Sequence, residues 1–303
     1  MTPGYRALRE SAAWLDLAGR GKIVARGQDR TRLLHAMTTN HVEQLAPGGG
    51  CYAFFLDAHG HILGDVNLFA GADYHLLDTE PETAGRLYRH LDRYIIADDV
   101  TLEDLTSATA TLALEGPRAA ELLSSVGAPV PELEYGHTAW GTRTVARVSS
   151  TGAAGFFLFL PKDEIDATSR QFTAAGAVAA TPQDALTVRL ENGRPRYGDD
   201  ITEDYLPHET QMLDAVHFNK GCYIGQEIVE RIRARGHVNR LLVRLAIEGT
   251  QEPAGEVTSA AYSPALGKVI AFAYLRAEQA REGNRLLVEG AQAEVLPFRP
   301  TNT

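Results

Sequence analysis

The chain has 303 residues, of which 44% are hydrophobic, and its 39 acidic and 29 basic side chains give a formal net charge of −10. This length suits two or three domains with a substantial core. The negative charge argues against a general binder of nucleic acid or of anionic membranes, because phosphate contacts need clustered lysine and arginine.

The sequence shows no pattern of export or membrane insertion. No run approaches the roughly 20 apolar residues that cross a bilayer, and Met1 to Gly4 lead into charged residues. The two cysteines, Cys51 and Cys222, form no Cys-x-x-Cys motif or Cys/His cluster, which argues against a disulfide and a self-contained metal site. We expect a cytoplasmic protein without disulfide or resident metal, and we take it to be a monomer.

Two segments of similar pattern follow one another along the chain. In each, a strand-like run and a glycine, Gly27 or Gly116, lead into a helix that carries a leucine pair. Each copy continues into further strand-like runs and a second helix, near 80–94 and near 163–175. The pattern predicts two related α+β halves of ferredoxin-like type, over residues 1–108 and 109–185.

The last third of the chain changes character twice. Residues 185–192 indicate a helical turn, and an acidic, loop-like stretch follows it, so we expect 186–236 to line a crevice. Over residues 237–303, short strand-like runs joined by Gly/Pro turns predict a small closed β-barrel. These runs lie at 240–247, 256–261, 268–275, 285–289 and 293–297.

The segment Lys220-Gly221-Cys222-Tyr223-Ile224-Gly225-Gln226-Glu227 places a cysteine between two glycines and before an amphipathic helix. The glycines permit a tight loop that exposes the thiol. A thiol near a helix N-terminus and cations tends toward the thiolate, and Lys220 and Arg231 are the cations that we expect to lower its pKa. The alternative is that Cys222 is a small buried hydrophobe.

This segment resembles the signature of the YgfZ family, folate-binding relatives of the glycine-cleavage T-protein. Three further motifs are similar to T-protein motifs and occur in the same order: 37–42, 114–117 and the pair 255–259 with 263–267. The resemblance covers nearly the whole chain. It implies an α+β protein of three domains in a cloverleaf, with tetrahydrofolate or a one-carbon derivative in a central channel.

The resemblance also implies site residues. Arg189-Leu190-Glu191-Asn192-Gly193 is similar to the T-protein motif whose glutamate holds the folate pterin, which implies that role for Glu191. Asp65 matches one acid of the T-protein Asp-Asp pair, and Gly64 replaces the other. Asn40 and Tyr223 lie in matched motifs and are candidate folate contacts. Without the resemblance, Glu191 would be an ordinary exposed acid and Asp65 a capping carboxylate.

The residues from Lys220 to Arg244 form a basic island in an acidic chain. The island suits a small polyanion such as a polyglutamylated folate tail. The alternative is a solvated helix face on which Glu227 and Arg231 pair at i,i+4.

The chain departs from T-proteins in the halved acid pair, a shortened turn after Thr151 and the presence of Cys222. The resemblance therefore implies a tetrahydrofolate-binding protein that supports iron–sulfur cluster assembly or repair with client or assembly proteins, with Cys222 as the working thiol. The alternatives are an aminomethyltransferase that acts with a lipoyl carrier protein, a folate-dependent demethylase of small methylamines, and a non-enzymatic folate carrier.

Overall fold

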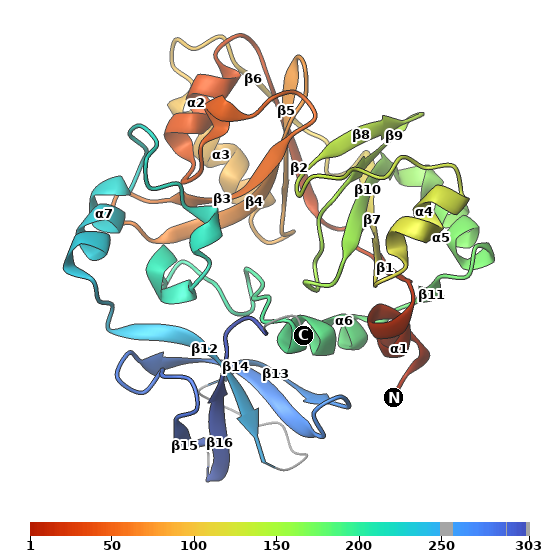
Figure 1. Cartoon of the computed structure of the whole chain (residues 1–303). Coiled ribbons are helices and arrows are strands. Elements are labelled where there is room, and N and C mark those ends of the chain that lie inside the picture. The colour runs from red at the N-terminus through yellow and green to blue at the C-terminus, as the bar shows by residue number, and fades with distance from the viewer. Residues whose placement is uncertain (249–256, 289, 301–303) are drawn as a thin grey trace.

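The computed structural model describes residues 1–248, 257–288 and 290–300, which form three lobes (Figure 1). Each lobe is built on its own sheet. The predicted organisation, two related α+β halves followed by a C-terminal β unit, is confirmed. Residues 255, 256 and 289, which belong to predicted motifs or strands of the C-terminal unit, lie outside the described residues.

The first lobe is a five-stranded antiparallel sheet in the order β3-β4-β5-β2-β6. Leu87 and Leu91, one helical turn apart, are fully buried in the same core cluster as the leucines of the preceding helix. The elements are β2 (Gly21–Arg26), α2 (Arg30–Met37), β3 (Gly50–Leu56), β4 (Ile62–Ala70), β5 (Tyr74–Thr79), α3 (Ala84–Tyr94) and β6 (Thr101–Asp104).

The second lobe is a six-stranded sheet in the order β11-β1-β7-β10-β9-β8. The helices of this lobe bury Leu122, Leu123 and Phe172 against it. The elements are β7 (Thr109–Glu115), α4 (Ala119–Ser125), β8 (His137–Trp140), β9 (Arg143–Ala146), β10 (Gly155–Pro161), α5 (Ile165–Ala174) and β11 (Val178–Ala179).

The N-terminal residues belong to this second lobe. Strand β1 (Ala13–Asp16) pairs antiparallel with β7 and parallel with β11, between the two, and α1 (Pro3–Glu10) precedes it. Ala13 and Leu15 are buried in one cluster with Phe157 of β10. The predicted first half, residues 1–108, therefore includes a strand that the structure places in the second sheet.

The internal repeat appears as matching positions in the two lobes. Leu33 and Leu34 of α2 are buried beneath the first sheet, and Leu122 and Leu123 of α4 are buried beneath the second. The copies differ at one edge, because β6 pairs directly with β2, whereas β1 separates β11 from β7.

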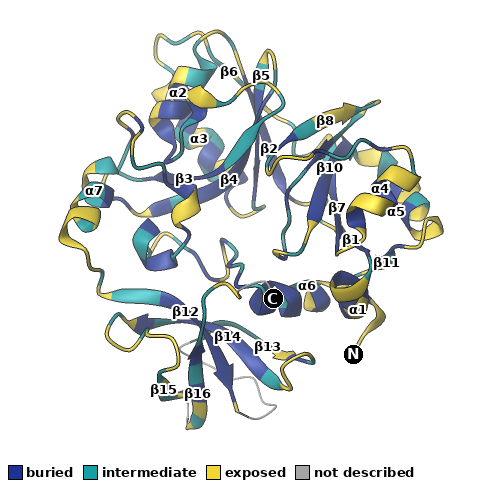
Figure 2. Ribbon diagram, in the orientation of Figure 1, coloured by how far each residue is buried: buried dark blue, intermediate teal, exposed yellow. Residues whose placement is uncertain are grey.

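A segment between the lobes begins with α6 (Pro182–Glu191), where the sequence suggested only a helical turn. The helix starts earlier than expected because Thr181 and Asp184 form a capping box and Pro182 occupies the first turn. Later in the segment, α7 (Gln226–Arg235) ends at Gly236 as predicted and buries only Val229 (Figure 2). Short 3-10 helices occur at Val42–Gln44, Lys162–Glu164, Pro207–Thr210 and Leu213–Ala215.

The C-terminal lobe is an antiparallel sheet in the order β13-β14-β12-β16-β15. Its core is one apolar cluster that includes Leu245, Val269 and Val295. Leu242, Ile270 and Phe272 instead cluster with Leu190 of α6, which attaches the lobe to the segment between the lobes. The strands are β12 (Arg240–Ile247), β13 (Val257–Ser263), β14 (Lys268–Arg276), β15 (Arg285–Val288) and β16 (Ala291–Leu296).

Gly193, just after α6, has a φ of 66°, and a Cβ there would lie 1.8 Å from the carbonyl oxygen of Phe298. We expect Gly193→Ala to lower the free energy of unfolding by at least about 2 kcal/mol more than Gly127→Ala, measured by urea denaturation. Gly127 is the matched control because its φ is 76° but its Cβ would meet no atom within 4 Å. Equal losses in the two variants would contradict the close packing at Gly193.

Candidate functional site

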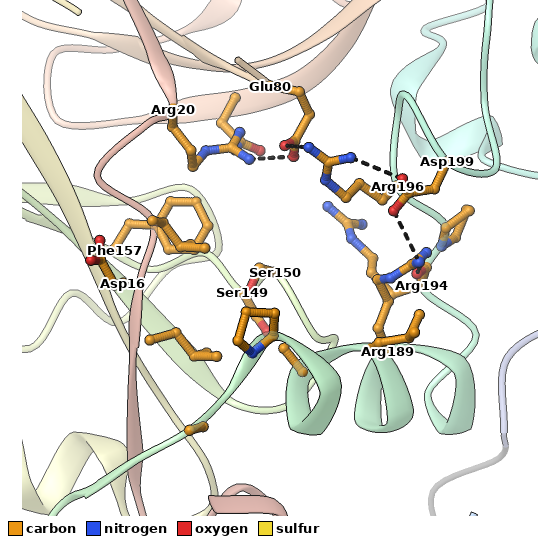
Figure 3. A pocket seen from close by; sticks show the side chains of 18 of the residues that line it. Asp16, Arg20, Glu80, Ser149, Ser150, Phe157, Arg189, Arg194, Arg196 and Asp199 are labelled. Carbon is orange, nitrogen blue, oxygen red and sulfur yellow. Dashed lines mark hydrogen bonds and ion pairs between the residues drawn. The ribbon is translucent and has the colours of Figure 1, made fainter. Parts of the chain in front are cut away.

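A cavity of about 490 Å³ lies between the two α+β lobes and α6 (Figure 3). Its lining comes from β1 and the turn after it, the inner strands of both sheets, α6 and the loop that follows α6. The lining residues are Leu15, Asp16, Leu17, Arg20, Tyr52, Asp65, Asn67, Glu80, Ser149, Ser150, Phe157, Ala180, Pro182, Gln183, Ala185, Leu186, Arg189, Arg194, Pro195, Arg196 and Asp199.

Asp65 and Asn67 are two buried polar residues that line this cavity. They are two residues apart on β4, so their side chains share one face of the sheet. Both are more than nine-tenths buried, with 8% and 5% exposure. Asp65 Oδ2 accepts a 2.8 Å hydrogen bond from the Tyr52 hydroxyl, and Asn67 Nδ2 donates to Asp78 at 2.8 Å. The Oδ1 atoms of Asp65 and Asn67 have no hydrogen-bond partner among the described residues.

The environment of Asp65 favours its neutral form. Burial raises the pKa of Asp65 to about 6, and the negative charge of Glu80 acts in the same direction. Arg20, the hydrogen bond from Tyr52 and Arg194 oppose this shift without cancelling it. A carboxyl group with this pKa can accept or release a proton near neutral pH at small cost.

A continuous chain of ion pairs runs along the cavity wall, and we call it the cavity ion-pair chain. Dashed lines in Figure 3 follow part of it. Burial alone would raise the pKa of Glu80, but Arg20 and Arg196 hold it below its usual value. In order, the chain is Asp78, Arg20, Glu80, Arg196, Asp199, Arg189 and Asp200.

Sequence reasoning found Asp65 in this cavity but missed most of its charged lining. The arginines at 189, 194 and 196 and the acids at 199 and 200 form an alternating charge pattern that could have indicated an ion-pair network. Arg20 and Glu80 stand alone in the sequence, and only the fold brings them to the site.

Glu191 lies at the end of α6 and does not line the cavity. Its Oε1 accepts hydrogen bonds from the Tyr5 hydroxyl at 2.7 Å and the Ser263 hydroxyl at 2.6 Å. Its Oε2 has no hydrogen-bond partner among the described residues, although Arg9 lies 3.6 Å away. Glu191 therefore joins α1, α6 and β13.

Asn40 also lies outside the cavity lining. Its Nδ2 donates to the carbonyl oxygens of Tyr52, at 2.8 Å, and Asp214, at 3.1 Å. The Asn40 side chain therefore fixes the backbone of β3 at Tyr52, the residue that donates to Asp65.

The loop before α7 exposes Cys222, as the glycines predicted. Lys220 is buried, and its ammonium group donates to the carbonyl oxygens of His35 and of Thr38, the latter at 2.6 Å. Burial lowers the pKa of Lys220 to about 8, although nearby Cys51 and Glu43 act in the opposite direction. Lys220 therefore turns toward the end of α2, although it precedes Cys222 by only two residues.

Tyr223 belongs to the same loop, and Arg231 lies on α7, which follows it. Tyr223 is buried, and the Lys220 ammonium nitrogen lies 4.9 Å from the centroid of its ring. The Tyr223 hydroxyl has no hydrogen-bond partner in the part of the chain described. Arg231 is exposed and pairs with Glu227. This pairing matches the solvated-face alternative for the basic island. Tyr223, Arg231 and Cys222 all lie outside the cavity lining.

No helix in the described residues is long and apolar enough to cross a membrane. Within the same residues, no group of three or more His, Cys, Asp or Glu side chains is arranged to hold a metal ion.

Comparison with known proteins identifies relatives along the whole chain. Residues 2–220 match the GCVT N-terminal domain, and residues 233–303 match the glycine cleavage T-protein C-terminal barrel domain. An aminomethyltransferase of Rubrobacter xylanophilus is 32% identical, covering 90% of this chain and 78% of the relative. One from Thermus thermophilus is 29% identical, covering 98% and 89%.

The glycine cleavage system aminomethyltransferase T from Bartonella henselae has the same fold. Its crystal structure superposes with a TM-score of 0.88 and 22% identity, covering 97% of this chain and 87% of that one.

The raised pKa of Asp65 gives a testable pH dependence. The folded state holds the proton more tightly than the unfolded chain, in which the pKa is about 3.9, so stability falls as pH rises from about 4 to above 6. Asp65→Asn stays neutral. We expect it to raise the free energy of unfolding by up to about 3 kcal/mol at pH 8, with no gain at pH 4, in urea denaturation. Asp92→Asn, at an exposed position of α3, is the control. An equal gain of Asp65→Asn at both pH values would contradict the assignment.

The two thiols should differ sharply in reactivity. Cys222 is exposed, whereas burial raises the pKa of the half-buried Cys51 to about 12. At pH 8 we expect a disulfide reagent to modify Cys222 at least about 100-fold faster than Cys51, measured by stopped-flow absorbance. Cys222→Ser should remove the fast phase and Cys51→Ser should keep it; loss of the fast phase in Cys51→Ser would refute this order.

Proposed function

Because the chain belongs to the glycine-cleavage T-protein family, we propose that its cavity binds tetrahydrofolate or a one-carbon derivative. The observation that carries the proposal is the pair of buried acceptors at Asp65 and Asn67, whose Oδ1 atoms have no donor among the described residues. Leaving such atoms unpaired is costly, and a bound ligand with N–H groups would satisfy them. Tetrahydrofolate carries several N–H donors and therefore fits this pair.

The first candidate activity is transfer of an aminomethyl-type one-carbon unit, which the names of the relatives favour. Bound in the cavity, tetrahydrofolate would supply the amine nitrogen that accepts the unit. Asp65 is then the group that takes a proton from this amine, on Oδ1, while Oδ2 stays fixed by Tyr52. Asn67 orients the ligand, and Arg20 and Glu80 set the charge around Asp65.

The second candidate is support of iron–sulfur cluster assembly or repair in client proteins, as in the YgfZ family. The exposure of Cys222 favours it, because a thiol on an outer loop can meet a partner protein without entering the cavity. In this version the cavity holds the folate and Cys222 is the working thiol. Lys220 and Tyr223 shape its loop, and Arg231, on the helix that follows, pairs with Glu227.

Glu191 and Asn40 have supporting places in both candidates. Glu191 can receive a hydrogen-bond donor on Oε2, which accepts no hydrogen bond in the described residues and lies 3.6 Å from Arg9, and Asn40 holds the β3 backbone. We expect Glu191→Ala to weaken tetrahydrofolate binding and Cys222→Ser to leave it unchanged.

A transfer assay separates the two candidates. Purified protein is given tetrahydrofolate and an aminomethyl-loaded lipoyl carrier protein, and the methylene-folate, free thiol and ammonia are quantified. For a transferase we expect Asp65→Asn to lower the rate at least about 100-fold with little change in folate affinity, and Cys222→Ser to have no effect.

Complementation of a strain that is deficient in iron–sulfur cluster assembly tests the second candidate. Folate binding without transfer, together with loss of rescue in Cys222→Ser, would identify the second candidate and reject the first. Full rescue by Cys222→Ser would reject the second. A wild-type protein that binds no tetrahydrofolate would contradict the proposed cavity ligand in both.

A further inference from the structure

Arg194 differs from the other arginines that line the cavity. Arg20, Arg189 and Arg196 each pair with at least one carboxylate of the cavity ion-pair chain. Over residues 1–248, 257–288 and 290–300, by contrast, no carboxylate oxygen lies within 4 Å of the Arg194 guanidinium. The positive charge of Arg194 is therefore not neutralised by a direct partner.

The guanidinium of Arg194 is held in place without such a partner. The Arg194 backbone N–H donates to the carbonyl oxygen of Arg189 at 2.9 Å, which continues the end of α6 into the cavity wall. The Arg194 side chain lies over the Tyr52 ring, with its guanidinium carbon 5.0 Å from the ring centroid. Asp214 attracts it electrostatically but pairs with Arg299 at 2.9 Å.

The same tyrosine connects Arg194 to the acceptor pair. Tyr52 donates to Asp65 Oδ2, so the unpaired cation and the unpaired Oδ1 acceptors of Asp65 and Asn67 belong to one part of the cavity. Arg194 is partly exposed as a residue, and its guanidinium also lies against Tyr135. A guanidinium carries a planar set of N–H donors that matches a carboxylate in a bidentate geometry. The cavity thus combines acceptors for N–H groups with a donor site for an anion.

We propose that Arg194 is a specificity-determining residue that binds a carboxylate group of the cavity ligand. This assignment rests on the proposed function, because it takes tetrahydrofolate to be that ligand or to share the cavity with it. The carboxylate has two possible sources, the glutamate part of tetrahydrofolate or a separate small amino acid beside the pterin ring. Either source would place a carboxylate beside Arg194, over the Tyr52 ring, while an N–H group of the ligand lies at Asp65.

Binding measurements with three ligand sets test this assignment. Tetrahydrofolate has carboxylates, 6-methyltetrahydropterin has the same ring system without one, and 6-methyltetrahydropterin with sarcosine supplies the carboxylate separately. Affinities are measured by isothermal titration calorimetry for wild type, Arg194→Met and Arg194→Lys. Arg118→Met is the matched control, because Arg118 is exposed on the second lobe and pairs only with Glu121 in the described residues.

We expect Arg194→Met to weaken tetrahydrofolate binding at least about tenfold and to leave 6-methyltetrahydropterin binding within about twofold of wild type. Arg194→Lys should lose less, because it keeps the charge but not the bidentate geometry. Arg118→Met should match wild type. If the carboxylate is a separate amino acid, the loss appears instead in sarcosine binding to the pterin-loaded protein.

Two results would overturn the assignment. One is equal weakening of all three ligand sets in Arg194→Met with wild-type thermal stability, which would make Arg194 a general support of the cavity. The other is unchanged affinity in every set. Failure of the wild-type protein to bind either pterin would instead contradict the proposed function, and the assignment would fall with it.

Discussion

The cavity ion-pair chain is the interaction on which the arrangement of the lobes depends. Its members come from the first lobe, the turn after β1, the end of α6 and the loop beyond α6. At its far end, Asp200 is fully buried and accepts from Thr258 of the C-terminal lobe at 2.7 Å. Alternating charges satisfy one another there, so several ionised groups can be removed from water.

This alternation also sets the chemistry of the cavity. The arginines of the chain keep Glu80 ionised, and its charge contributes to the raised pKa of Asp65. The structure therefore places one carboxyl group with near-neutral pKa beside a wall of alternating acidic and basic side chains. Holding Asp65 in this state costs folding stability, which is typical of residues kept for function rather than for stability.

The fold was largely predictable because each lobe obeys local rules. The leucine pairs at 33–34 and 122–123 mark equivalent helices, and the strand periodicity of 62–70 and 240–247 agrees with β4 and β12. Two features were not predicted from the sequence, because one depends on distant contacts and the other on helix capping. The insertion of β1 into the second sheet needs partners nearly a hundred residues or more away, and α6 is defined by its capping box.

The candidate site was predictable only where a motif named it. Asp65 lines the cavity, whereas Glu191 and Asn40 lie outside the lining and contact its surroundings; the folate contacts that the resemblance implies for all three stay predictions. Lys220 shows the limit of reasoning from sequence proximity. Its ammonium group is drawn to the carbonyl oxygens at the end of α2, which a buried cation needs more than it needs a neighbouring thiol.

We propose that the cavity between the α+β lobes holds the folate at Asp65 and Asn67. The most direct measurement is a crystal structure of the full chain with tetrahydrofolate bound. We predict ligand N–H groups within hydrogen-bond distance of both Oδ1 atoms. Folate bound outside this cavity, for example against the exposed loop at Cys222, with both Oδ1 atoms still unpaired, would contradict it.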